Sequence, residues 1–121
     1  MKSGRILIVE DDPVTAIAHR KRLAREGYQV EIASDGAKGL ERLSEFQPDA
    51  ILLDLQIPVF SGLELLKKIR ASENFQHLPI IVFTSATTPQ LIDDCISAGA
   101  TRVFEKWALS SGLLLEELKA I

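Results

Sequence analysis

Polar side chains that could bind a cation or a phosphoryl group follow four of the five short apolar runs in the sequence. They are Glu10, Asp11 and Asp12 after the first run, Asp54 after the third, Thr84 and Ser85 after the fourth, and Glu105 and Lys106 after the fifth. Several carboxylates within a few ångströms cannot all stay ionised without a cation, because each raises the pKa of the others. Oxygen ligands at this density favour a hard ion, and Mg²⁺ that keeps several waters fits a shallow, solvent-facing site.

A carboxylate beside a metal ion and a lysine can attack phosphorus and form an acyl phosphate. The metal and Lys106 would then neutralise the oxygens of the phosphoryl group, which is most of what phosphoryl transfer requires of a protein. The hydroxyl of Thr84 could donate a hydrogen bond to the phosphate. The polar residues therefore predict phosphoryl chemistry, provided that the fold brings them to one place.

Each of these residues also has a purely structural interpretation. Asp12 is expected to cap a helix, and capping or solvation would also account for Glu10 and Asp11. Asp54 alone would be a turn residue, and Lys106 alone would lie on the surface. The occurrence of such residues at four strand ends favours the functional interpretation over four separate coincidences.

Five short apolar runs alternate with amphipathic stretches along the chain. The predicted strands are Ile6–Val9, Val30–Ala33, Ala50–Leu53, Ile80–Phe83 and Val103–Phe104. The first, third and fourth are continuously apolar, as in strands covered on both faces, whereas the second alternates and is typical of an edge strand.

The stretches between the runs carry signals for the start and end of helices. Asp12 and Thr88 are each followed by proline, a combination that favours the first turn of a helix. Gly27 and Gly99 stand where the first and fourth helices should end. The pattern predicts an α/β fold of five βα units, in which right-handed crossovers make the strands parallel and place helices on both faces. In such a sheet, ligands bind beyond the carboxyl ends of the strands.

Length and composition limit the classes of protein to consider. The 121 residues suit one domain spanning 1–121, with 46% hydrophobic and 26% charged residues. The net charge of −3 argues against a nucleic-acid surface, and no apolar segment approaches a membrane span. The single cysteine, Cys95, predicts a small buried side chain and a reducing, cytoplasmic location.

Four segments in this order resemble response-regulator receiver domains over essentially the whole chain. They are ILIVEDD, ILLDLQIPVFSG, IIVFTSA and AGATRVFEKW. The resemblance implies a doubly wound, flavodoxin-like three-layer sandwich with strand order 2-1-3-4-5. It also implies that Asp54 accepts the phosphoryl group, that Asp11 ligates Mg²⁺ directly, and that Glu10 acts through a bound water. Gln56 would contribute a backbone carbonyl to the metal, Thr84 would be the switch hydroxyl, and Lys106 would bind the phosphate.

The same resemblance implies a signalling domain rather than an enzyme, with at most slow hydrolysis of its own aspartyl phosphate. A sensor histidine kinase or a phosphotransfer protein would donate the phosphoryl group. The fourth helix, fifth strand and fifth helix would form the face for an output protein or a homodimer. The consecutive leucines 113–115 support such a face, because at least one of them is expected to point away from the core.

Two residues depart from the family pattern. Val103 stands where receiver domains typically carry an aromatic residue that turns inward with the switch hydroxyl, so this relay is in question. Trp107 replaces the proline after the lysine, and a cis bond before a non-proline residue costs roughly 2.5–4 kcal/mol. We therefore expect a trans bond or a shifted loop, with Trp107 as a packing residue or, if exposed, as an anchor for a partner.

Three alternative functions remain at this point. A degenerate receiver that serves only as an interaction or dimerisation module would explain Val103 and Trp107. A haloacid-dehalogenase-type phosphatase would need a second aspartate at Gln56, and a flavodoxin relative would need a phosphate-binding loop after the first strand. His19 and His77 are expected to be solvated, and the stretch from His19 to Arg22 could meet an acidic surface of a kinase.

Overall fold

The computed structural model describes residues 1–85 and 88–121, and within them strands and helices alternate along the chain. The strands are β1 (Gly4–Val9), β2 (Tyr28–Ala33), β3 (Ala50–Asp54), β4 (Ile80–Thr84) and β5 (Arg102–Glu105). The helices are α1 (Pro13–Arg25), α2 (Gly36–Phe46), α3 (Gly62–Ala71), α4 (Pro89–Ser97) and α5 (Ser111–Lys119), with a 3₁₀ turn, η1, at Glu73–Phe75. The strands are longer than the apolar runs because polar residues also pair: Asp54 lies beside Phe83, and Thr84 beside Glu105.

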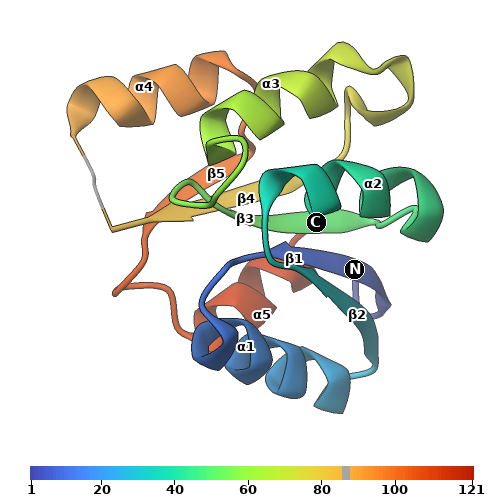
Figure 1. The fold of residues 1–121 in the computed structure, drawn as a ribbon. Coiled ribbons are helices and arrows are strands. Elements are labelled where there is room, and N and C mark those ends of the chain that lie inside the picture. Colours follow the sequence, from blue (N-terminus) through green and yellow to red (C-terminus); the bar gives the residue numbers. More distant parts are fainter. Residues whose placement is uncertain (86–87) are drawn as a thin grey trace.

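The five strands form one parallel sheet in the order β2-β1-β3-β4-β5. Helices α1 and α5 cover one face of this sheet, and α2, α3 and α4 cover the other (Figure 1). The predicted doubly wound, flavodoxin-like architecture is thereby confirmed. Strand order reverses at β1 and β3, so the crevice expected for a ligand lies beyond the carboxyl ends of these two strands.

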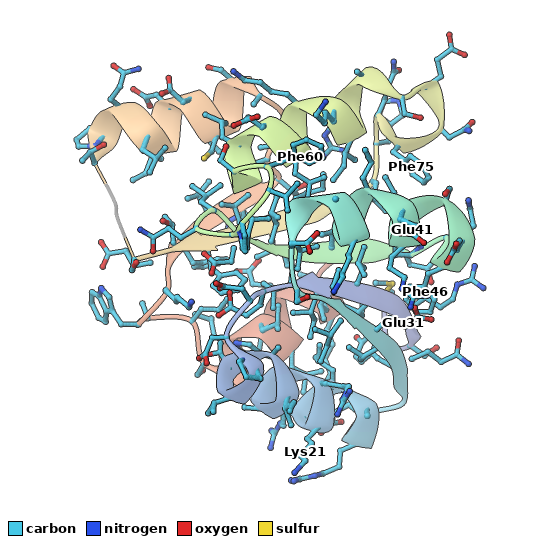
Figure 2. The ribbon with its side chains drawn as sticks, viewed as in Figure 1. Lys21, Glu31, Glu41, Phe46, Phe60 and Phe75 are labelled. Atoms are coloured by element: carbon cyan, nitrogen blue, oxygen red, sulfur yellow. The ribbon has the colours of Figure 1, made fainter. Side chains whose placement is uncertain are left out.

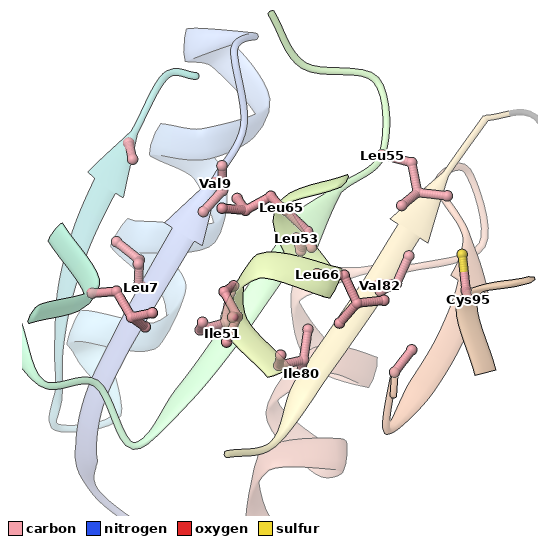
Figure 3. Close-up of a cluster of buried hydrophobic side chains, with 14 residues drawn as sticks. Leu7, Val9, Ile51, Leu53, Leu55, Leu65, Leu66, Ile80, Val82 and Cys95 are labelled. Carbon is pink, nitrogen blue, oxygen red and sulfur yellow. The ribbon is translucent and has the colours of Figure 1, made fainter. Parts of the chain in front are cut away.

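Alternating side chains of the central strands fill two separate apolar cores. The core under α2, α3 and α4 receives Leu7, Val9, Ile51, Leu53, Ile80 and Val82 (Figure 3). The core under α1 and α5 receives Ile6, Ile8, Ala50, Leu52, Ile81 and Phe83. This division follows from the two-residue period of a strand. Because both faces are buried, the strands read in the sequence as continuous apolar runs.

The helices begin where the sequence predicts. The side chains of Asp12 and Thr88 accept hydrogen bonds from the backbone N–H three residues ahead, on Thr15 and Leu91. Asp35, Ser61 and Ser110 cap α2, α3 and α5 in the same way. Gly27 follows the end of α1 with a φ of +99°, a conformation that disfavours residues with a Cβ.

The leucines of α5 correct one expectation from the sequence. Leu114 and Leu115 are buried, and Leu113 is half-buried against the same core, so none of the three is an exposed apolar residue. The helix turns its polar face outward with Glu116 and Lys119 instead. Cys95 is buried, as predicted. Every helix in residues 1–85 and 88–121 is too short or too polar to cross a lipid bilayer.

Polar contacts at the amino ends of the strands are satisfied and exposed to solvent. The Asp49 carboxylate accepts a hydrogen bond of 2.8 Å from the backbone N–H of Arg5. The guanidinium of Arg5 donates to the carbonyl of Gln47 at 3.1 Å. These bonds join the start of β1 to the turn before β3, and they need no further partner.

Candidate functional site

The acidic residues after β1 separate into one buried and two exposed carboxylates. Glu10 is 1% exposed and continues the buried strand, whereas Asp11 and Asp12 lie at the surface. Asp12 caps α1 as predicted, and its hydrogen bond from Thr15 lowers the pKa of its carboxyl. Glu10 and Asp11 do not cap a helix, and they lie beside Asp54 at the end of β3.

The buried position of Glu10 makes its charge costly. The pKa of Glu10 is raised from 4.5 to about 8, mainly by burial and then by the neighbouring Asp54 carboxylate. The ammonium of Lys106 lies 2.6 Å from Glu10 Oε1 and opposes this rise. Neither Glu10 oxygen makes a hydrogen bond of good geometry with a described residue, and its contact with Lys106 is an ion pair. A buried carboxylate in this state can accept a cation.

Asp54 ends the central strand β3 and is also buried. Its Oδ1 accepts a hydrogen bond of 3.0 Å from the backbone N–H of Gln56, and its Oδ2 lies 3.1 Å from Lys106 Nζ. Both contacts orient the carboxylate toward the rim of the sheet. The side chain of Gln56 is exposed and accepts a short hydrogen bond from the Ser85 hydroxyl.

Lys106 reaches this rim because its backbone is fixed beside β4. Its N–H donates to the carbonyl of Thr84 at 2.8 Å, directly after β5 ends. Burial lowers the pKa of Lys106, but its contacts with the Glu10 and Asp54 carboxylates outweigh that effect and raise it. Thr84 is fully buried at the carboxyl end of β4. Lys106 is therefore a permanent positive charge between two carboxylates.

Glu10, Asp11 and Asp54 together form a cluster that could hold a metal ion. One oxygen from each lies within 4.8 Å of one oxygen from each of the others. All the donors are carboxylate oxygens, which suits a hard divalent cation. The structure thus brings Glu10, Asp11, Asp54 and Lys106 into one cluster at the carboxyl edge of the sheet, with Thr84 and Gln56 on the strand end and loop beside it.

Comparisons with known proteins agree with this geometry. The model of the response regulator receiver domain matches residues 6–118. The chain belongs to this family. It is a receiver domain of two-component signalling. Ala86, the last residue of the IIVFTSA segment, lies outside the described residues.

Two relatives illustrate the range of proteins that this receiver domain resembles. It is 40% identical over 83 residues to the response regulator MprA of Mycobacterium ulcerans, covering 69% of this chain and 35% of MprA. It is 41% identical over 87 residues to the sensor histidine kinase TmoS of Ectopseudomonas mendocina, covering 72% of this chain and 9% of TmoS. The chain therefore spans about a third of one relative and less than a tenth of the other.

Among solved structures, the chemotaxis response regulator CheY4 of Vibrio cholerae superposes with a TM-score of 0.89 at 28% identity, covering 98% of both chains. This likeness extends over both faces of the sheet. The family assignment replaces the dehalogenase-type and flavodoxin alternatives drawn from the sequence.

The two departures from the receiver pattern have different structural outcomes. All peptide bonds within residues 1–85 and 88–121 are trans, so the Lys106–Trp107 bond is trans as predicted. Trp107 is 81% exposed, and the expectation that it packs against the domain is wrong. A turn closed by Ala108 N–H to the Glu105 carbonyl keeps the chain at the surface here. Val103 is half-buried and packs against the apolar core under α4.

His19 is a further residue whose placement differs from the prediction. It is 6% exposed rather than solvated, because Ala16, His19 and Leu23 form the inner face of α1. Lys21 extends from the outer side of this helix, away from the sheet (Figure 2). Burial, and then the charge of Lys106, lower the pKa of His19. The three- and four-residue spacing of 16, 19 and 23 was the available signal. His77 is exposed, as predicted.

Proposed function

We propose that this receiver domain accepts a phosphoryl group on Asp54 in a two-component phosphorelay. The observation that carries the proposal is the pairing of the buried Asp54 carboxylate with Lys106 at 3.1 Å, within a cluster that also contains Glu10 and Asp11. One Asp54 oxygen is held by the Gln56 N–H, which orients the carboxylate for attack.

We further propose that Mg²⁺ binds at this cluster, held by Glu10, Asp11, Asp54 and the backbone carbonyl of Gln56. The residues fit such an ion because the buried Glu10 oxygens lack hydrogen bonds among the described residues, and because the donors are all oxygens. When bound, Mg²⁺ would supply positive charge that balances the carboxylates and the phosphoryl oxygens.

The protein groups then have distinct tasks in the transfer. An Asp54 carboxylate oxygen attacks the donor's phosphorus, forming an O–P bond as the bond from phosphorus to the donor nitrogen or oxygen breaks. The electron pair of the broken bond stays with the donor. Lys106 neutralises a phosphoryl oxygen, and the Thr84 hydroxyl donates a hydrogen bond to another. Glu10 and Asp11 remain unmodified.

We assign the domain to signalling proteins rather than enzymes, with at most slow hydrolysis of its own aspartyl phosphate. The donor in this proposal is a sensor histidine kinase or a phosphotransfer protein. The output is an interaction surface on α4, β5 and α5, which binds an output protein or a second copy of the chain. A single receiver domain spanning 1–121 and a cytoplasmic location are parts of the same proposal.

The test is modification by a small phosphodonor. The purified domain is incubated with acetyl phosphate and Mg²⁺, and intact mass is measured for the wild type, Asp54→Asn and Asp49→Asn. We expect one added phosphoryl group on the wild type and on Asp49→Asn, whose carboxylate lies at the opposite end of the sheet, and none on Asp54→Asn. EDTA should abolish the modification.

Two results would contradict the proposal. An unmodified wild type, also unable to bind beryllofluoride with Mg²⁺, would favour a degenerate receiver that acts only through its surface, with the exposed Trp107 as its anchor. Equal modification of Asp54→Asn would show that another residue accepts the phosphoryl group.

A further inference from the structure

A polar contact joins α1 and α5, two helices that share an apolar core. The His19 Nδ1 atom is 3.0 Å from the hydroxyl of Ser111, the first residue of α5. Both helices pack on the same core, and His19 is almost fully buried between them. A buried imidazole costs free energy unless it is hydrogen-bonded, so the Ser111 contact fixes its orientation.

The same imidazole touches an aromatic ring that extends to the phosphorylation site. The rings of His19 and Phe83 meet edge to face, with centroids 6.2 Å apart and planes at 71°. The ammonium of Lys106 lies 5.6 Å from the centroid of Phe83, within the range of a cation–π contact. Phe83 is 1% exposed and immediately precedes Thr84. One buried ring therefore separates His19 from the lysine that pairs with Asp54.

Phosphorylation would change the forces on this lysine. Lys106 is now held by two carboxylates, Glu10 and Asp54. Adding a phosphoryl group to Asp54 places new anionic oxygens farther from the sheet, so the ammonium would gain partners on the side away from Asp54 Oδ2. Any movement of the ammonium alters its contact with the Phe83 ring, which also contacts the His19 ring.

We propose that His19 is a positioning residue that couples occupancy of the phosphorylation site to the packing of α1 against α5. It acts through Phe83 on Lys106 and through Ser111 on the first turn of α5. This inference rests on the proposed function, and it gives the domain a route from the site to a helix seam that does not involve Val103. Val103 belongs to the core on the opposite face of the sheet.

The charge environment of His19 makes the coupling measurable. Of its neighbours, Phe83 on β4 and Ser111 on α5 are neutral, and Lys106 is the charged group that lowers the pKa of His19 besides burial. Anionic charge added beside Lys106 weakens its effect on the imidazole. At constant Mg²⁺, beryllofluoride should therefore raise the pKa of His19.

The first experiment follows the two histidines by NMR. Imidazole signals of the wild type are titrated with pH in Mg²⁺ alone and in Mg²⁺ with beryllofluoride. We expect the His19 titration to move to higher pH and that of His77, exposed in the loop before β4, to stay unchanged. Equal behaviour of the two histidines, or an unchanged His19, would overturn the inference.

The second experiment removes the hydrogen bond between His19 and Ser111 by substituting each partner in turn. Hydrogen exchange is measured at the Leu113 and Leu114 amides, which bond to Ser110 in the first turn of α5. Beryllofluoride should change their exchange rates about fivefold in the wild type, the factor given by a typical net hydrogen-bond contribution. His19→Phe keeps the ring but loses the bond, and Ser111→Ala loses it from the other partner. Both should abolish the change while still binding beryllofluoride.

His19→Asn, which can still bond Ser111, should restore part of the response, and His77→Phe should behave as the wild type. If His19→Phe does not fold, Ser111→Ala alone decides, because Ser110 and not Ser111 caps the helix. A full response in the folded variants would overturn the inference and leave the proposed function intact. A wild type that fails to bind beryllofluoride would overturn both.

Discussion

The two ends of the sheet both place an aspartate near a basic residue, yet they differ in burial and in hydrogen bonding. At the amino end, Asp49 and Arg5 are exposed and their bonds go to backbone groups. At the carboxyl end, Asp54 is 0% exposed and Lys106 bridges it to the buried Glu10. At the amino end the polar groups join two segments of the chain. At the carboxyl end the charged groups form ion pairs that a cation or a phosphoryl group could replace.

The difference shows how to distinguish structural from functional polar residues in this fold. A pair that water already satisfies gains little from a ligand, and its removal costs little. A buried group without its full complement of hydrogen bonds gains much from a cation or phosphate. Substitutions at the two ends should therefore differ in the size of their effects on stability and on ligand binding.

The largest effect on stability is expected from Lys106→Met. Removal of the ammonium leaves Glu10 and Asp54 facing each other without a counterion, which should lower the free energy of unfolding by roughly 3–5 kcal/mol without Mg²⁺. Arg5→Met at the amino end should cost about 1 kcal/mol or less. Urea unfolding in EDTA followed by circular dichroism gives both values, and equal losses would contradict the distinction between the two ends.

A smaller loss is expected from Gly62→Ala at the first residue of α3, which lies against the end of β3 beside Asp54. A Cβ at Gly62 would overlap the Leu55 backbone and lie 2.5 Å from the carbonyl oxygen of Asp54. The forced backbone shift should destabilise the domain by roughly 1–3 kcal/mol and weaken beryllofluoride binding. At Gly112 in α5 the nearest atom to a new Cβ is 3.8 Å away, so Gly112→Ala should be neutral or stabilising. Thermal unfolding of the two variants makes the comparison.

Stability without metal should depend on pH through Glu10. Its pKa is 4.5 when unfolded and about 8 when folded, so the folded state binds the proton more tightly. The stabilisation that protonated Glu10 gives to the folded state is fully present below pH 4.5 and is lost as the pH rises toward 8. Because Mg²⁺ prefers the ionised carboxylate, its stabilising effect should be larger at about pH 8.5 than at about pH 6.

Urea midpoints in EDTA and in MgCl₂ at those two pH values test this dependence. Glu10→Gln should remove most of the pH dependence, and Asp49→Asn at the other end should retain it. If Mg²⁺ stabilised the domain equally at both pH values, Glu10 would not take part in binding the ion.

The smallest effect is expected from Val59→Gly in the loop between β3 and α3. Val59 is 68% exposed and has a φ of +73°, which is unfavourable for a β-branched residue. Glycine removes this strain but adds freedom to the unfolded chain, so we expect a gain of about 1 kcal/mol or less. Thermal unfolding measures the gain, and phosphorylation by acetyl phosphate should continue. A loss of stability would mean that the valine side chain makes a contact that outweighs the strain.

The sequence predicted the fold well because its signals are local and agree with one another. Continuous apolar runs, Asp12 and Thr88 as helix caps, and glycines after α1 and α4 each follow from a few neighbouring residues. The crevice was also predictable, because parallel strands bring Glu10, Asp54 and Lys106 to the same edge whatever their separation along the chain. The roles of individual residues in that crevice stay predictions.

The errors concern residues whose environment depends on how two helices or a loop pack. His19 reads as part of a basic stretch, and only the register of α1 turns it toward α5 and away from Lys21. At least one of the leucines 113–115 was expected to face away from the core, yet all three are buried in it or packed against it. Trp107 reads as a packing residue because it is large and apolar, but it is 81% exposed, and Leu109 is the residue of this loop that enters the core. Such facts require three-dimensional placement.

The placement of Trp107 has a practical consequence. It is the single tryptophan of the chain, it is 81% exposed, and it is bonded directly to the lysine at the crevice. Because the chain has no second tryptophan, the fluorescence of this indole reports on binding and modification near Lys106. Titrations with cations, phosphodonors or binding proteins can therefore be followed in the unlabelled molecule by steady-state or stopped-flow fluorescence.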